Sequence, residues 1–138
     1  MVTDLAWIIR VPGNWGLEVG ILAEVHRNCA NRRVCQVDLA DSYEHRHQDL
    51  SAANPLRGLL KMSVDIAKTM FRTLASDGVV LSDEALKTLR ATYLQVVRET
   101  IEKYEHVAAV NGLLFDRYAE RTAVEAFLKG ISLATETF

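Results

Sequence analysis

The stretch AWIIRVPGNWGLEVG at residues 6–20 decides the fold expected for this chain. Residues 6–11, all apolar except Arg10, predict a short strand, which the proline and glycine that follow interrupt. Asn14 can then cap a helix from about residue 15 to 27. A second, mostly alternating stretch, RVCQVDL at residues 33–39, predicts another strand. Strand, helix and strand together predict part of an α/β fold whose sheet needs partner strands that the chain does not offer.

The chain from residue 55 onward has a different composition, rich in Leu, Ala, Val and charged residues at helical spacing. This periodicity predicts three helices, from 55 to about 76, from 83 to about 110, and from about 118 to 134. Ser82 is expected to cap the second of them. The spacing of the aromatic residues predicts core positions rather than stacking platforms for Tyr93, Tyr104, Phe115, Tyr118 and Phe127. The chain is thus divided into an α/β portion, 1–54, and a helical region, 55–138.

Composition excludes several classes of protein. The chain has 138 residues, which suits one domain, and 49% hydrophobic residues argue against disorder. Sixteen basic and 18 acidic residues give a net charge of −2, so the basic footprint of a nucleic-acid-binding protein is absent. No apolar run suggests a membrane span, and the first residues do not resemble a signal peptide. With only two cysteines, we expect a cytoplasmic protein with free thiols.

The glycine-containing turn before the first helix is one candidate site. Gly16 could let an anionic ligand approach the backbone at a helix N-terminus, which attracts anions. Glu18 would place a carboxylate beside that ligand. The glycine spacing matches neither the dinucleotide fingerprint nor the phosphate loop. The alternative is a tight turn with close helix packing at Gly16 and Gly20, in which Glu18 only complements the helix dipole.

The polar stretch YEHRHQD at residues 43–49 is the other candidate site. If it is extended, His45 and His47 lie on one side of the chain. Imidazoles among carboxylates suit Zn²⁺, Mn²⁺ or similar ions, although no complete metal motif is present. Arg46 could equally bind a phosphate. The alternative is a solvated polar loop.

These segments, in this order, resemble the glucosyl-3-phosphoglycerate synthase family. The resemblance is carried by NWGLEVG at 14–20, RVCQVDL at 33–39 and YEHRH at 43–47, and by the tail segments FRTLA at 71–75, GVVLS at 78–82 and LRATYL at 89–94. It implies a partial GT-A (Rossmann-like) glycosyltransferase domain, of which this is the acceptor-side portion, followed by a three-helix C-terminal region. It also implies transfer of glucose from a nucleotide-glucose to 3-phosphoglycerate with retention, on the route to glucosylglycerate. A divalent metal, Mg²⁺ or Mn²⁺, and a homodimer are implied as well.

The resemblance also implies roles for individual residues of this sequence. It implies that His45 ligates the metal and that Arg46 and His47 lie near the phosphoglycerate. Glu18 is the implied catalytic residue, at the acceptor side of the pocket, and Gly16 of the same run is implied to bind substrate. The family's aspartate-containing metal motif belongs to a nucleotide-binding half that has no counterpart in this sequence. We therefore expect an internal fragment that is inactive alone.

Two alternatives remain open at this point. A mannosyl-3-phosphoglycerate synthase or a related glycosyltransferase would share the acceptor side. A non-catalytic helical interaction module would explain the amphipathic helices of the second region without any chemistry.

Overall fold

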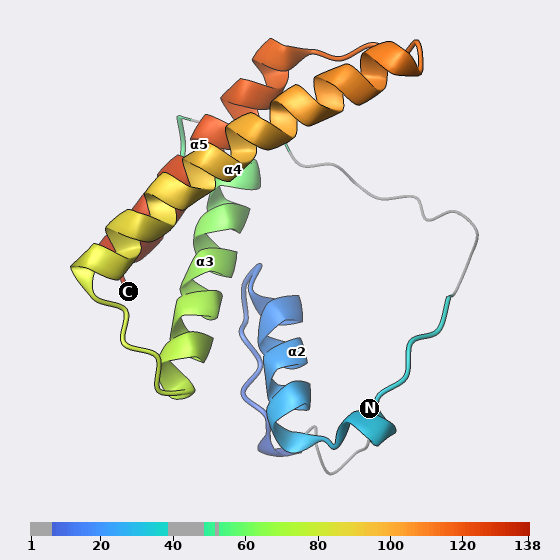
Figure 1. Ribbon diagram of the computed structural model, residues 1–138. Helices are drawn as coiled ribbons and strands as arrows, with labels where there is room; N and C mark the ends of the chain where they lie inside the picture. The colour runs from blue at the N-terminus through green and yellow to red at the C-terminus, as the bar shows by residue number, and fades with distance from the viewer. Residues whose placement is uncertain (1–6, 39–48, 52) are drawn as a thin grey trace.

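The computed structural model describes residues 7–38, 49–51 and 53–138 (Figure 1). Its elements, in chain order, are helix α2 (Leu17–Asn28), the 3-10 turn η1 (Asn31–Arg33) and helices α3 (Gly58–Ser76), α4 (Asp83–Val110) and α5 (Arg117–Glu136). None of these described residues forms a β-strand. None of the described helices is long and apolar enough to cross a membrane.

The predicted α/β fold is wrong for the part of the chain that the structure describes. Trp7 and Ile8, in the first predicted strand, are helical. Residues 34–38, in the second, follow the 3-10 turn as exposed chain without regular structure. A strand is stable only when neighbouring strands satisfy its backbone N–H and C=O groups, and within the described ranges neither segment has such a neighbour. The GT-A architecture is therefore not seen here.

The three helices predicted for the second region are present. Helix α4 has the predicted bounds, and Ser82 caps it by accepting a hydrogen bond from the Ala85 N–H at 3.2 Å. Helix α3 begins later than predicted, at Gly58. The reason is a turn just before the helix, in which the side-chain oxygen of Asn54 accepts a hydrogen bond from the Leu56 N–H at 3.0 Å, so that Arg57 is the N-cap residue.

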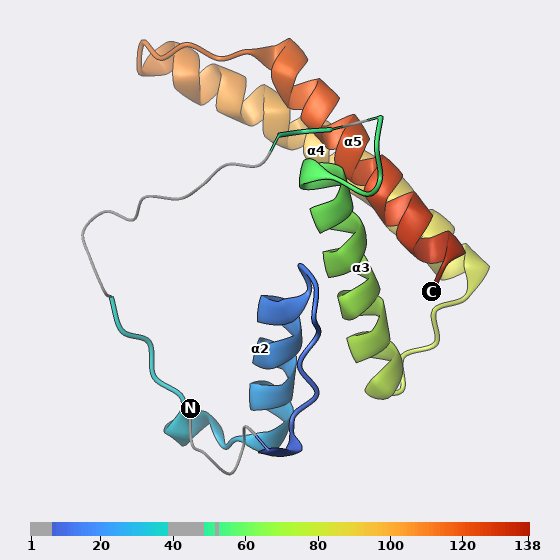
Figure 2. The ribbon, with the colours of Figure 1, turned by 180° about the vertical axis from the view of Figure 1, so that it is seen from behind.

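Helix α3 is the central element of the structure. It packs on α5 on one side and on α2 on another, and α5 also packs on α4 (Figures 1 and 2). Leu60 of α3 is completely buried, with 0% of its surface exposed. A buried cluster extends the core, and its members are Val64, Ala67, Phe71, Leu86 and Ala134. Gly130 lets α5 approach α3 closely, because a Cβ there would lie 3.0 Å from the Cβ of Ser63.

Helices α4 and α5 form an antiparallel hairpin whose closed end extends past α3 (Figures 1 and 2). The 28 residues of α4 span about 42 Å. Gly112, with a φ of 65°, makes the turn after α4. Tyr104 and Tyr118 lie at this end and are 58% and 81% exposed, so the prediction that they are core residues is wrong. Helical spacing identifies one face of a helix, but that face is buried only where another element packs on it. Helix α3 does not reach the closed end of the hairpin, so these tyrosines stay exposed.

Candidate functional site

The start of α2 is organised by Asn14. Its side-chain oxygen accepts a hydrogen bond from the Gly16 N–H at 2.9 Å, and its backbone oxygen accepts from Leu17 at 3.1 Å. The N-cap position itself is Gly16, which has no side-chain cap. Asn14 thus forms a turn before the helix rather than capping it as predicted.

Gly16 and Gly20 lie in close contact with other segments. Gly16 is buried, and a Cβ built on it would overlap the side chain of Thr69 on α3. A Cβ on Gly20 would lie 2.6 Å from Cγ of Pro12. Both glycines are therefore required by packing, which was one of the two interpretations of this turn. Binding of substrate at Gly16 stays a prediction.

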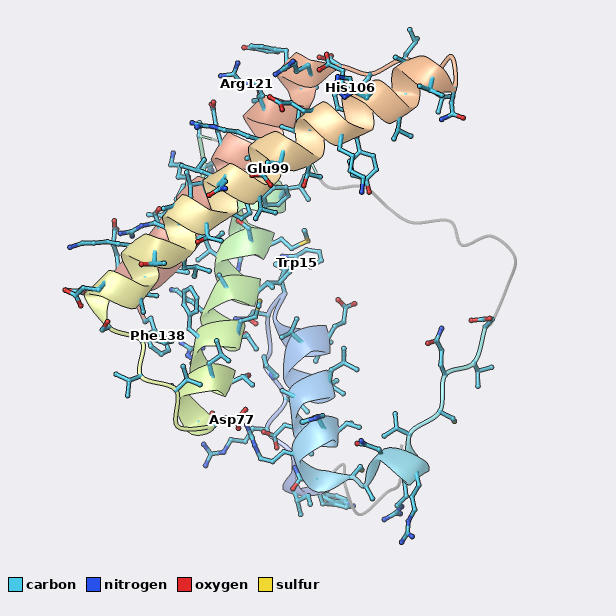
Figure 3. All side chains as sticks on the ribbon, in the orientation of Figure 1. Trp15, Asp77, Glu99, His106, Arg121 and Phe138 are labelled. Carbon is cyan, nitrogen blue, oxygen red and sulfur yellow. The ribbon has the colours of Figure 1, made fainter. Side chains whose placement is uncertain are left out.

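Glu18 lies in the first turn of α2, and its side chain is exposed. A carboxylate at this position is stabilised by the positive end of the helix dipole and remains accessible to a ligand. Trp15, 44% exposed, lies close by at the same end of α2 (Figure 3). This end of the helix therefore carries an accessible acid and a partly exposed indole ring.

The opposite end of α2 is tethered to the end of α3. Arg27 forms ion pairs with Glu24 on its own helix and, at 3.0 Å, with Asp77 after α3. The hydrogen bond to Asp77 is the main reason why the pKa of Arg27 is raised. Because this pair is exposed to solvent, it contributes little to stability and chiefly orients α2 on α3.

The predicted histidine site lies outside the described residues. This applies to His45, Arg46 and His47, so their predicted roles stay predictions. Among residues 7–38, 49–51 and 53–138, no group of three or more His, Cys, Asp or Glu side chains could hold a metal ion. The described residues therefore do not provide a site for the implied divalent metal.

Sequence reasoning missed an apolar groove at the closed end of the α4–α5 hairpin. Its volume is about 480 Å³, and its lining includes Ile101, Tyr104, Leu113, Phe115 and Val124. One feature of the sequence indicates this groove. The connection between the two helices contains Leu113 and Leu114, whereas a solvated turn usually consists of polar residues. The groove is lined by residues of α4, of α5 and of the connection between them, and by no residue of α2.

Comparison with known proteins finds two curated relatives, whereas no protein-family model and no solved structure matches the chain. Glucosyl-3-phosphoglycerate synthase of Persephonella marina is 47% identical over 137 residues, which are 99% of this chain and 34% of that protein. The protein of the same name from Methanococcoides burtonii is 38% identical over 139 residues, again 34% of its length. The chain thus spans about a third of the length of these relatives. They confirm that it is similar to glucosyl-3-phosphoglycerate synthases along its whole length.

Proposed function

We propose that this chain provides the acceptor side of an enzyme that transfers glucose from a nucleotide-glucose to 3-phosphoglycerate with retention. The observation that carries the proposal is the 47% identity, over 99% of the chain, to a protein named glucosyl-3-phosphoglycerate synthase. Because the chain spans 34% of that relative, the proposal assigns the nucleotide-binding site to polypeptide corresponding to the other two thirds. The homodimer implied by the resemblance is part of the same proposal.

In this proposal Glu18 acts on the acceptor. Its exposed carboxylate can accept a hydrogen bond from the hydroxyl group of 3-phosphoglycerate that attacks the sugar, and so orient that hydroxyl. The phosphate and carboxylate of the acceptor are anionic, and the N-terminal end of α2 favours negative charge nearby. Arg46 and His47 are the proposed partners of those acidic groups.

The proposal includes Mg²⁺ or Mn²⁺, with His45 as a ligand. When bound, such an ion would neutralise the diphosphate that leaves the donor sugar. The described part of the chain holds no cluster suited to it, so none of the roles given to described residues depends on the metal.

A chimera tests the proposal. This chain would replace the matching third of the Persephonella marina synthase, and formation of glucosyl-3-phosphoglycerate would be measured from nucleotide-glucose and 3-phosphoglycerate. We expect transfer, and we expect Glu18→Gln to lower turnover about 100-fold or more, the usual contribution of a positioned acid or base. Glu84→Gln is the matched control, because Glu84 is also exposed in the first turn of a helix.

Two results would contradict the proposal. One is a chimera that is folded by circular dichroism and shows no transfer. The other is a Glu18→Gln chimera as active as the Glu84→Gln control, which would remove Glu18 from the mechanism. The 138-residue chain alone is expected to show no transfer, and turnover of about 1 per second from it would also contradict the assignment of the donor site elsewhere.

The apolar groove favours a second candidate, a non-catalytic helical interaction module. Such a module would bind a partner protein and need no acid at Glu18. The chimera experiment distinguishes the two candidate functions, because an interaction module would give a chimera that is folded but inactive.

A further inference from the structure

We propose that the closed end of the α4–α5 hairpin is where two copies of the chain associate, each docking on the same surface of the other. We call this surface, formed by residues 97–124, the hairpin tip. The inference rests on the homodimer of the proposed function but not on its chemistry, and it names the surface that makes the dimer. Four features of the tip support it: the groove, the side chains beside it, its charges and its position.

The groove is suited to apolar side chains rather than to a small polar ligand. Its volume of about 480 Å³ is large enough for several side chains, and its walls come from α4, from α5 and from the connection between them. Thr100 and Glu120 are polar, while nine other lining residues are apolar or aromatic. A small-molecule site usually has several convergent polar groups that fix the orientation of the ligand. An apolar wall of this kind favours an apolar protein surface as the occupant.

The tip also carries apolar side chains that project into solvent. Val110, Leu114 and Tyr118 are 87%, 104% and 81% exposed. Val110 ends α4, and Tyr118 lies in the first turn of α5, so they frame the connection that forms one wall of the groove. One surface therefore contains both a recess and projections of matching apolar character. A two-fold axis can place the projections of each copy in the recess of the other, which is the self-complementary contact of a symmetric dimer.

The exposed apolar area is sufficient for such a contact. A stable interface buries about 800 Å² on each partner. Tyr104 and Tyr118 alone expose roughly 200–350 Å², since an aromatic side chain presents about 150–250 Å² in full. Val107, Val110, Leu113 and Leu114 add to this, with exposed fractions from 45% to 104%. Monomeric proteins rarely leave this much apolar surface exposed in one region of the fold.

Charge does not oppose contact between two identical tips. Arg117 pairs with Glu105 at 2.8 Å and with Glu102 at 3.8 Å, so acidic and basic groups are already interspersed at the edge of the groove. Arg121 and Glu120 add one charge of each sign. Two copies related by a two-fold axis therefore bring together surfaces of mixed charge, and no block of like charge has to be buried.

The position of the tip allows a second copy to bind while α2 meets other polypeptide. The tip extends beyond α3, away from α2, which carries Glu18 (Figures 1 and 2). Figure 3 shows His106 and Arg121 at the tip, well separated from Trp15 at α2. Polypeptide that completes an active site at Glu18 has to meet α2, whose exposed apolar residues, including Leu22, are available for it. Contact between two tips therefore does not compete for the surface of α2.

The experiment measures the association of the 138-residue chain itself, by sedimentation equilibrium between about 1 μM and 1 mM. We expect a reversible monomer–dimer equilibrium. The double variant Val110→Glu with Leu114→Glu is expected to raise the dissociation constant at least tenfold, because it buries unpaired charge in the contact. Both side chains are almost fully exposed, so the fold is retained, as circular dichroism would verify. Leu22→Glu on α2 is the matched control, since Leu22 is also exposed, at 68%, and lies away from the tip.

Each outcome supports or overturns the proposal. A dimer that weakens only in the tip variant supports it. A chain that is monomeric at every concentration, a dimer that survives the tip variant, or a dimer broken by Leu22→Glu overturns it. Association that continues beyond two copies also overturns it, because a two-fold contact closes on itself. Sedimentation does not depend on enzyme activity. An inactive chimera would therefore contradict the proposed function, whereas an absent dimer would contradict only the proposed contact at the hairpin tip.

Discussion

Replacing Gly16 by alanine separates the two interpretations of the turn before α2. The added Cβ would lie 2.7 Å from the Cβ of Thr69 and would overlap its hydroxyl oxygen. Thr69 is 6% exposed, and its hydroxyl donates to the backbone oxygen of Asp65 at 3.0 Å. This β-branched side chain lies within α3 and has few rotamers available, so it cannot move aside easily. We expect α2 to be displaced from α3 in the variant.

The expected cost follows from two contributions. Forcing an extra methyl group into a packed contact costs about 1–3 kcal/mol. Alanine is also a poorer N-cap residue than glycine, which adds up to about 1 kcal/mol. The free energy of unfolding should therefore fall by about 1–4 kcal/mol, and the midpoint of thermal unfolding by about 3–15 °C.

The assay is urea denaturation followed by tryptophan fluorescence and by circular dichroism. Both tryptophans, Trp7 and Trp15, precede α2, so fluorescence reports on its docking while circular dichroism follows all the helices. Gly13→Ala is the matched control: a Cβ there meets no atom within 4 Å, and its effect should stay within about 0.5 kcal/mol. Equal unfolding midpoints for the two variants would refute the packing argument and leave ligand approach as the reason for a glycine at this position.

Leu60→Ala should lower the free energy of unfolding by about 2–5 kcal/mol in the same assay, since it removes a completely buried side chain between helices; a loss below about 1 kcal/mol would show that Leu60 is not a core residue. Burial raises the pKa of Tyr93 above its ordinary value of 10.0. The folded chain therefore keeps the phenol neutral while the unfolded chain ionises, and the free energy of unfolding falls as the pH rises from the ordinary pKa through the raised one. Denaturation at about pH 9 and about pH 11 should show a smaller alkaline loss for Tyr93→Phe than for the unaltered chain. In an active chimera, His45→Ala should lower turnover about 10- to 100-fold or more and alter its dependence on Mg²⁺ and Mn²⁺, and His47→Ala far less. Titration of turnover with each metal checks this, and equal effects would remove His45 as a ligand.

The helices could be predicted because their signals are local. The apolar stripe of α4 recurs at helical spacing, and Ser82 bonds to an N–H only three residues away. Such features depend on a few neighbouring residues, so the sequence contains all the information needed. The predicted strands failed for the opposite reason. Residues 6–11 and 33–39 have apolar patterns typical of strands, but a strand also needs a partner, and none exists among the residues described.

The candidate site could be predicted only in part. Glu18 lies in the first helical turn as the sequence indicated, because that placement depends on a local turn. The contact between Gly16 and Thr69 joins residues far apart in the chain, so the glycine spacing could suggest packing but not its partner. The exposure of Tyr104 was missed because periodicity identifies a face without showing how far the neighbouring helix extends. His45 and its neighbours lie outside the described residues, and their roles are unaffected by this comparison.

The packing of α3 against α5 also governs the order in which the chain can fold during synthesis. Chains emerge from the ribosome N-terminus first, and the whole of α4 lies between these two helices. The apolar stripe of α3, including Leu60 and Phe71, is therefore covered only in part, by α2 and by Leu86 of α4, until α5 has emerged and Ala134 can reach it. We expect nascent chains that stop before Arg117 to be cut by protease within α3, and chains that include α5 to resist. The uncovered part of α3 should be accessible to chaperones until α5 has been made.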